Sequence, residues 1–140
     1  MKFLADVADP VTVLGQQVSL MWIVIGAALV VFMQAGFALV ETGFTQAKNA
    51  AHVVSTNFAI FGLGFIGFYL VGFSFSFGGF SYSAFGMDSP VGSALIGSGD
   101  WIFFWKGGWA LTGDAITPAA IGFFLYMVAF MDTVATIPTG

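Results

Sequence analysis

Three long apolar runs constrain this chain more than any other feature. Residues 20–40 and 53–77 contain no charged side chain, and residues 117–137 contain a single one, Asp132. Because a helix rises about 1.5 Å per residue, each run would be about 30 Å long or more, enough to cross the hydrocarbon core of a bilayer. Within that core only a helix or a closed barrel satisfies its own backbone. The sequence therefore predicts an all-α membrane protein with three transmembrane helices.

The scarcity of charge supports a bilayer location and excludes several functions. Charged residues make up 7% of the chain, whereas about 25% is usual in a soluble domain. Three lysines stand against seven acids and there is no arginine, so no basic face could neutralise nucleic-acid phosphates. There is no cysteine to form a disulfide, a thiolate nucleophile or a cysteine metal site. No hydrolase, kinase or phosphate-loop motif is present, so we expect neither an enzyme nor a catalytic residue, metal site or cofactor.

The residues between the runs indicate a loop and the ends of helices. The glycine-rich residues 78–116 hold three acids and the patch WIFFW, which predicts a loop on one side of the membrane with its tryptophans in the headgroup layer. Residues 73–77, FSFSF, alternate like a strand, but a lone strand leaves its backbone unpaired in lipid, so we expect the end of a helix. Thr117 and Pro118 are typical of an N-cap and a first helical position, and Pro138 should disrupt the last turn of that helix.

The lysines leave the orientation open. Three spans place the two termini on opposite sides of the membrane, with Lys2 and Lys106 on one side and Lys48 on the other. By number, the positive-inside rule favours the first side as cytoplasmic, whereas by proximity to a span it favours the side of Lys48. The chain stops at Gly140, directly after the third run. We interpret that end as the end of a piece of a longer protein.

Asp132 is the charge inside a span and the main candidate for an intramembrane site. A carboxylate at that depth costs about 2.5 kcal/mol or more, so it must face protein or water, or carry a proton. One interpretation is a pore-adjacent or helix-packing acid, and the other is a carboxyl satisfied by Thr133, Thr136 or another helix. The second is favoured because no basic residue lies within the spans. His52, the single histidine, is interpreted as an interfacial polar residue rather than a proton site.

Two patterns indicate how the three helices pack. Small residues in the first two spans should let the helices approach closely: Gly26, Gly36, Gly62, Gly64, Gly67 and Gly72. A stripe at helical spacing follows the third span: Phe123, Tyr126, Met127, Phe130, Val134 and Ile137. Spacing alone favours a packing face, with attraction of a cation by the ring faces as the functional alternative. Asp132 lies about 200° around the helix from Phe130, so the two should not line the same wall.

Several segments resemble the ammonium transporter (Amt/Rh/methylammonium permease) family. Residues 33–49 read MQAGFALVETGFTQAKN, which is similar to the family's first-helix signature, an apolar helix ending in small residues and then a short turn with a basic residue and asparagine. Residues 72–78, GFSFSFG, resemble the end of its second helix, and residues 123–140 resemble its third helix. The resemblance extends from about residue 20 to the last residue.

This resemblance implies a topology and an assembly. The family fold is an eleven-span subunit in a homotrimer of the plasma membrane, with the N-terminus outside. Residues 1–19 would then be an extracytoplasmic segment and residues 20–140 a partial transporter domain. Its spans would cover about 20–40, 53–77 and 117–137, with loop 78–116 outside. The lipid bilayer surrounds such a protein, and a cytosolic regulatory protein is a further partner to expect.

The resemblance also implies a route for ammonium or ammonia. In the family, an external aromatic vestibule recruits the ion, an aromatic gate closes below it, and a narrow apolar pore with two histidines passes the neutral amine while the proton follows separately. Phe130 matches the gate phenylalanine, and Tyr126 matches an aromatic position one turn above, in the outer vestibule wall. Met127 falls where many members have glutamine. His52 matches neither pore histidine, and no role transfers to Asp132.

Two other functions stay open. The same helices would serve an ammonium-sensing membrane domain of a signalling protein, in which case a signalling module would follow Gly140. A stand-alone three-span membrane protein would require the gene to end there. The transporter interpretation expects that the three helices do not conduct alone.

Overall fold

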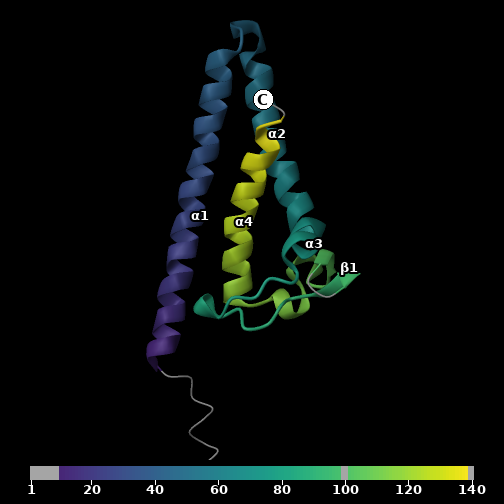
Figure 1. Ribbon diagram of the computed structural model, residues 1–140. Coiled ribbons are helices and arrows are strands. Elements are labelled where there is room, and N and C mark those ends of the chain that lie inside the picture. The colour runs from purple at the N-terminus through teal and green to yellow at the C-terminus, as the bar shows by residue number, and fades with distance from the viewer. Residues whose placement is uncertain (1–9, 99–100, 139–140) are drawn as a thin grey trace, which may run out of the picture.

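Three long helices lie along one another and form an elongated bundle (Figure 1). This computed structural model describes residues 10–98 and 101–138. Within the described residues, three helical segments are long and apolar enough to cross a membrane: Pro10–Phe44, Ala47–Phe77 and Pro118–Thr136. The predicted all-α membrane fold with three transmembrane helices is therefore confirmed. We call the end of the bundle that carries residues 78–117 the loop end, and the end that carries the 3-10 turn Ala47–Asn49 the turn end.

The first helix, α1, is longer than the run that predicted it. It spans Pro10–Phe44, 35 residues or about 52 Å, whereas the uncharged run covers residues 20–40. Proline is accepted at the start of a helix because its missing N–H would be unpaired there anyway. Helix hydrogen bonds are local, so a helix continues past the point where apolar side chains end. Residues 10–19 therefore belong to α1 rather than to a separate segment, and the remainder of that predicted segment, 1–9, lies outside the described residues.

The second long segment changes its winding partway. It consists of α2 (Ala50–Gly67), a π-helical turn (Phe68–Gly72) and α3 (Phe73–Phe77). The prediction that FSFSF is the end of a helix is confirmed by α3. In the π turn the Phe68 ring lies over Gly72, where an added Cβ would come within 2.8 Å of Phe68 Cδ2. A glycine at this position lets the ring stay against the helix.

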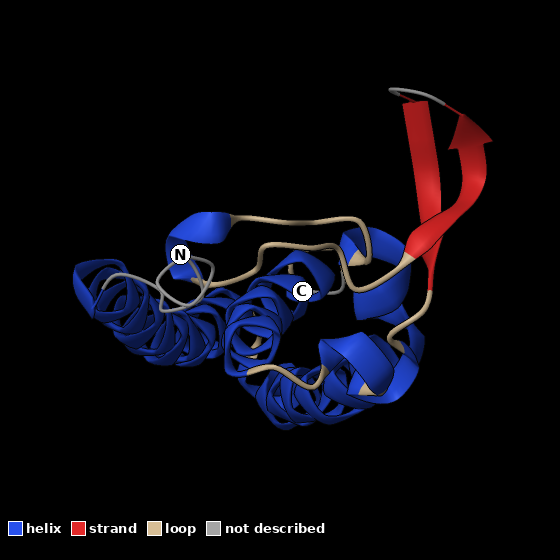
Figure 2. Ribbon diagram, turned by 90° about the horizontal axis from the view of Figure 1, so that it is seen from below, coloured by secondary structure: helices blue, strands red, loops and turns tan. Residues whose placement is uncertain are grey.

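The stretch between the second and third spans contains a β-hairpin that the sequence interpretation had assigned simply to a loop. β1 (Ser93–Ser98) pairs antiparallel with β2 (Trp101–Lys106), and the hairpin projects away from the helices (Figure 2). Its isoleucine, phenylalanine and tryptophan residues favour strands, and a two-stranded ribbon is possible where water can solvate its open edges. The Phe104 ring of β2 packs edge-on against Phe75 of α3, with centroids 5.7 Å apart.

The third span, α4 (Pro118–Thr136), begins as predicted and lies between the other two (Figure 1). The Thr117 hydroxyl caps it by accepting a hydrogen bond from the Ala120 N–H over 3.1 Å. At the loop end α4 meets a layer of packed rings, which we call the aromatic layer: Phe68, Phe73, Phe77, Phe80, Phe85, Phe123 and Phe124. The closest pair is Phe80 and Phe123, stacked with centroids 4.3 Å apart and planes 10° from parallel.

The buried face of α4 differs from the predicted packing stripe. Phe123 is buried, but Phe130, Val134 and Ile137 are 38%, 67% and 63% exposed. The face toward the other helices holds Asp132, which is 3% exposed, together with small and threonine side chains. Toward the turn end, the predicted stripe is therefore not the face by which α4 packs against α1 and α2. The inward face of α4 there carries polar side chains instead, and Thr136 bonds to Gln34 of α1.

Candidate functional site

Two of the residues singled out from the sequence form an aromatic pair on α4. The rings of Tyr126 and Phe130 lie one turn apart, with centroids 5.0 Å apart and planes at 54°. Tyr126 also packs against α1 at Gly26, where an added Cβ would come within 3.1 Å of the Tyr126 ring. Phe130 is 38% exposed. The aromatic pair therefore presents a ring surface that the described helices leave uncovered.

Asp132 lies on the other side of α4 and does not join the aromatic pair. Its carboxyl is buried, and none of the described residues donates a hydrogen bond to either of its oxygens. The Thr133 hydroxyl donates to the Ala129 carbonyl over 3.2 Å, and the Thr136 hydroxyl donates to the backbone carbonyl of Asp132 over 3.0 Å. The interpretation that these threonines satisfy the carboxyl is therefore wrong. A threonine hydroxyl in a helix reaches the carbonyl one turn back more readily than a neighbouring side chain.

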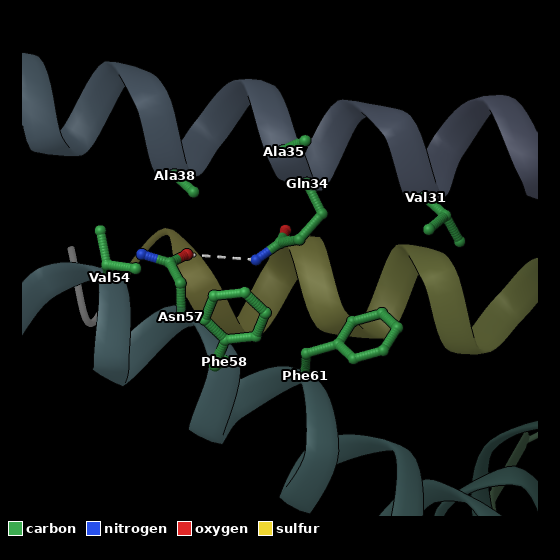
Figure 3. Close-up of a pocket in the computed structure, with 8 residues that line it drawn as sticks. All are labelled: Val31, Gln34, Ala35, Ala38, Val54, Asn57, Phe58 and Phe61. Carbon is green, nitrogen blue, oxygen red and sulfur yellow. Dashed lines mark hydrogen bonds between the residues drawn. The ribbon is translucent and has the colours of Figure 1, made fainter.

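Near Asp132, hydrogen bonds between side chains tie all three helices together. Gln34 of α1 donates through Nε2 to Thr136 Oγ1 of α4 over 2.6 Å and to Asn57 Oδ1 of α2 over 3.2 Å. Figure 3 shows the Gln34 and Asn57 side chains pointing toward each other across the gap between α1 and α2. Asn57 Nδ2 donates to Glu41 Oε2 over 2.7 Å and to the Val53 carbonyl over 3.1 Å.

We call this bonded set the polar cluster: Gln34, Glu41, Asn57 and Thr136. Gln34 and Asn57 are 8% and 5% exposed, so an unpaired amide at either position would cost about 1–3 kcal/mol. A hydrogen bond between membrane helices contributes about 0.6 kcal/mol on average and up to about 1.7. Because such bonds require particular donor and acceptor positions, the polar cluster fixes the register of the three helices.

Gln34 and Asn57 were not among the predicted site residues, although the sequence carries a signal for them. Gln34 is the single amide side chain in the run 20–40, and Asn57 is the single one in the run 53–77. A polar side chain inside a span is costly unless it finds a partner on another helix. Two isolated amides in consecutive spans therefore predict an interhelical bond. His52, by contrast, is exposed near the turn end and its side chain has no part in the polar cluster.

One cavity adjoins the polar cluster and a second adjoins Asp132. The larger, about 180 Å³, lies between α1 and α2 and is lined by Val31, Gln34, Ala35, Ala38, Val54, Asn57, Phe58 and Phe61 (Figure 3). The smaller, about 60 Å³, is lined by Val31, Phe61, Phe65, Leu125, Val128, Ala129 and Asp132. The carboxyl of Asp132 is the one ionisable group in either lining. Among the described residues, no group of three or more His, Cys, Asp or Glu side chains could hold a metal ion.

Comparison with known proteins adds family information. The model of a family described as Ammonium Transporter Family matches residues 21–140. The ammonium transporter Amt2 of Archaeoglobus fulgidus is 35% identical over 124 residues, which are 88% of this chain and 22% of the relative. The putative ammonium transporter sll0537 of Synechocystis is 33% identical over 120 residues, 86% of this chain and 18% of the relative. The ammonium transporter Amt1 of Haloferax mediterranei is 35% identical over 133 residues, which are 92% of this chain and 25% of the relative.

The chain thus spans between 18% and 25% of the length of these relatives. No solved structure matches it.

Proposed function

The chain belongs to the ammonium transporter family, and we propose that it supplies three of the spans of a protein that carries ammonium or ammonia across the membrane. The observation that carries the proposal is the family match over residues 21–140, which includes almost the whole described bundle. The relatives are named ammonium transporters, and the family is one of transporters rather than enzymes. The proposed substrate is therefore a small cation or its neutral amine, with no cofactor.

We assign the transport gate to Phe130 and the outer vestibule wall to Tyr126. An aromatic face attracts a cation by about 0.5–2 kcal/mol, depending on how far the cation is desolvated. A ring across an apolar route also obstructs hydrated ions. An ion that passed the ring would lose its water in apolar surroundings, where a charge is poorly solvated. The partly exposed ring of Phe130 and its contact with Tyr126 support this role, since a ring that lines a route must stay out of the packed core.

The proposed setting is the plasma membrane, with the N-terminus and the loop end outside and the turn end in the cytoplasm. Lys48 supports this orientation because it is exposed on the short turn between two spans, where the positive-inside rule acts most strongly. Large apolar side chains also cover the outward face of α1, with Phe32 and Leu39 each 75% exposed. Such a face fits lipid, further spans or neighbouring subunits, as in the proposed homotrimer. A cytosolic regulatory protein would meet the turn end.

Replacing Phe130 by alanine in the complete protein tests the gate. Uptake of ammonium per membrane-inserted protein should change by about tenfold or more, or selectivity over hydrated cations should be lost, because the ring's attraction for a cation is worth up to about 2 kcal/mol. Assembly should stay close to that of the parent, since the described helices leave the ring partly uncovered. The measurement is uptake and ion selectivity, normalised to inserted, assembled protein.

The matched control is Val134→Ala, one turn further along the same face and 67% exposed. Its uptake should remain near the parent's. Phe123, a member of the same sequence stripe, is a poor control because it is 5% exposed within the aromatic layer. The packing role would stand, and the gate assignment would be wrong, if Phe130→Ala transported like the parent or failed only through loss of assembly.

A further inference from the structure

Three buried oxygen atoms between α1 and α4 share one property. They are Oδ1 and Oδ2 of Asp132 and Oε1 of Gln34, and none of the described residues donates a hydrogen bond to any of them. The two side chains are 3% and 8% exposed. All three atoms are acceptors if the carboxyl is ionised. A buried acceptor without a donor is costly, so the Asp132 carboxyl needs a proton, a water or a cation.

None of the other described residues offers a donor for this carboxyl. The threonine hydroxyls nearby donate to backbone carbonyls, and the Gln34 amide N–H groups bond to Thr136 and Asn57. The other described titratable side chains on the surrounding helices are Glu41 on α1, His52 and Tyr69 on the second segment, and Tyr126 on α4, and none of them lines the Asp132 cavity. Lys48 and Lys106 are exposed outside the spans.

Further spans could not easily supply the donor either. Each of the three oxygens is already enclosed by the described helices. Additional helices pack on exposed surface, and these atoms present almost none. The missing hydrogen bond must therefore be made within the enclosure that α1, α2 and α4 form.

The lining of the cavity selects among the possible occupants. Apart from Asp132, it consists of apolar side chains from α1, α2 and α4. A bare metal cation needs several oxygen ligands, about six for hard divalent ions, and such a lining cannot provide them. A proton removes the charge and turns one carboxyl oxygen into a donor. The cavity of about 60 Å³ also exceeds the roughly 10–15 Å³ that one water requires.

We propose that Asp132 is a proton-binding site, a neutral carboxylic acid whose O–H donates to a water in this cavity. The proton gives the carboxyl a donor and removes its charge, and the water gives that donor an acceptor inside the cavity. This site is argued from the enclosure of the two Asp132 carboxyl oxygens and does not depend on the transport function or on the gate at Phe130.

Infrared spectroscopy of the complete protein labelled with ¹³C-aspartate tests the proposal. At neutral pH the labelled parent should show the C=O stretch of a protonated carboxylic acid, and the band should move when the protein is exchanged into D₂O. Asp132→Asn should remove this band while insertion and assembly stay close to the parent's, because an amide has the same shape and can donate and accept without charge. Asp132→Ala should lower the yield of assembled protein.

The matched control is Asp88→Asn, the same substitution at an exposed acid of the loop end. It should remove carboxylate bands and leave the protonated band in place. If Asp132→Asn does not assemble, Asp132→Glu in labelled protein gives the same assignment, because the new carboxyl carries no label. The proposal is overturned if the labelled parent has no protonated band at neutral pH, or if either Asp132 variant leaves that band unchanged.

Discussion

The two halves of α4 hold their neighbours by different forces. Toward the loop end, Phe123 and Phe124 pack among the other rings of the aromatic layer. Toward the turn end, Thr136 bonds to Gln34, which bonds in turn to Asn57. In a bilayer, apolar contact between helices gains little from leaving the solvent, since lipid is as apolar as phenylalanine, and only close packing adds stability. The aromatic half therefore depends on shape, whereas the polar half depends on particular donors and acceptors.

The largest loss of stability should follow from removing a ring from the aromatic half of α4. Phe123→Ala removes the ring that stacks on Phe80 at 4.3 Å and leaves a cavity among side chains that cannot close it. We expect a loss of about 3 kcal/mol or more in the free energy of unfolding, measured on the complete protein by denaturant or thermal unfolding in detergent. Phe123→Leu keeps most of the volume and should lose about half as much. Equal losses for the two variants would show that shape is not what this half depends on.

An intermediate effect should follow from breaking the polar half. Gln34→Leu and Asn57→Leu each leave a buried partner short of a hydrogen bond and should cost about 1–2 kcal/mol. Together they should cost less than the sum, with a coupling of about 1 kcal/mol in a double-mutant cycle. Thr56→Val is the matched control on the same helix, because the Thr56 hydroxyl donates within α2 to the His52 carbonyl. A coupling between Gln34 and Thr56 as large as that with Asn57 would contradict a directed bond.

The smallest effect should appear where the two halves meet. An added Cβ at Gly26 would come within 3.1 Å of the Tyr126 ring, whereas an added Cβ at Gly36 would meet nothing within 4 Å. Gly36→Ala should stabilise α1 by about 0.5–1 kcal/mol through helix propensity. Gly26→Ala should gain nothing or lose up to about 1 kcal/mol, because the ring must move. The test is the free energy of unfolding of both variants under the same conditions. If both variants were more stable than the parent, α1 and α4 would not be in close contact at Gly26.

The sequence alone predicted the features that depend on interactions between residues close together in the chain. Long apolar runs predicted the three spans, and Thr117 before Pro118 predicted the start of α4, because capping needs only a hydroxyl and the next few N–H groups. The angle between Asp132 and Phe130 also followed from helical geometry alone, and the structure buries the first while leaving the second partly exposed. In each case the deciding atoms lie within a few residues of one another.

What the sequence left undecided depends on partners far along the chain. The Gln34–Thr136 bond joins residues 102 positions apart, so no local pattern could have identified Thr136 as its acceptor. For the same reason the stripe through Phe130 could not be recognised as facing away from the other two helices. The hairpin of β1 and β2 escaped notice because its glycines suggested a loop, while its pairing depends on two segments meeting outside the hydrocarbon core.

The polar cluster also has a consequence for how the protein is made. Gln34 and Asn57 are 23 positions apart, so they reach the membrane in consecutive spans and can bond as soon as the second span has left the ribosome and entered the lipid. Thr136 arrives much later, after the hairpin and the rest of the loop end have been synthesised. Until then Gln34 has only Asn57 as a partner, and α1 and α2 form a two-helix intermediate in the bilayer. Insertion of α4 then supplies Thr136, the second partner of Gln34.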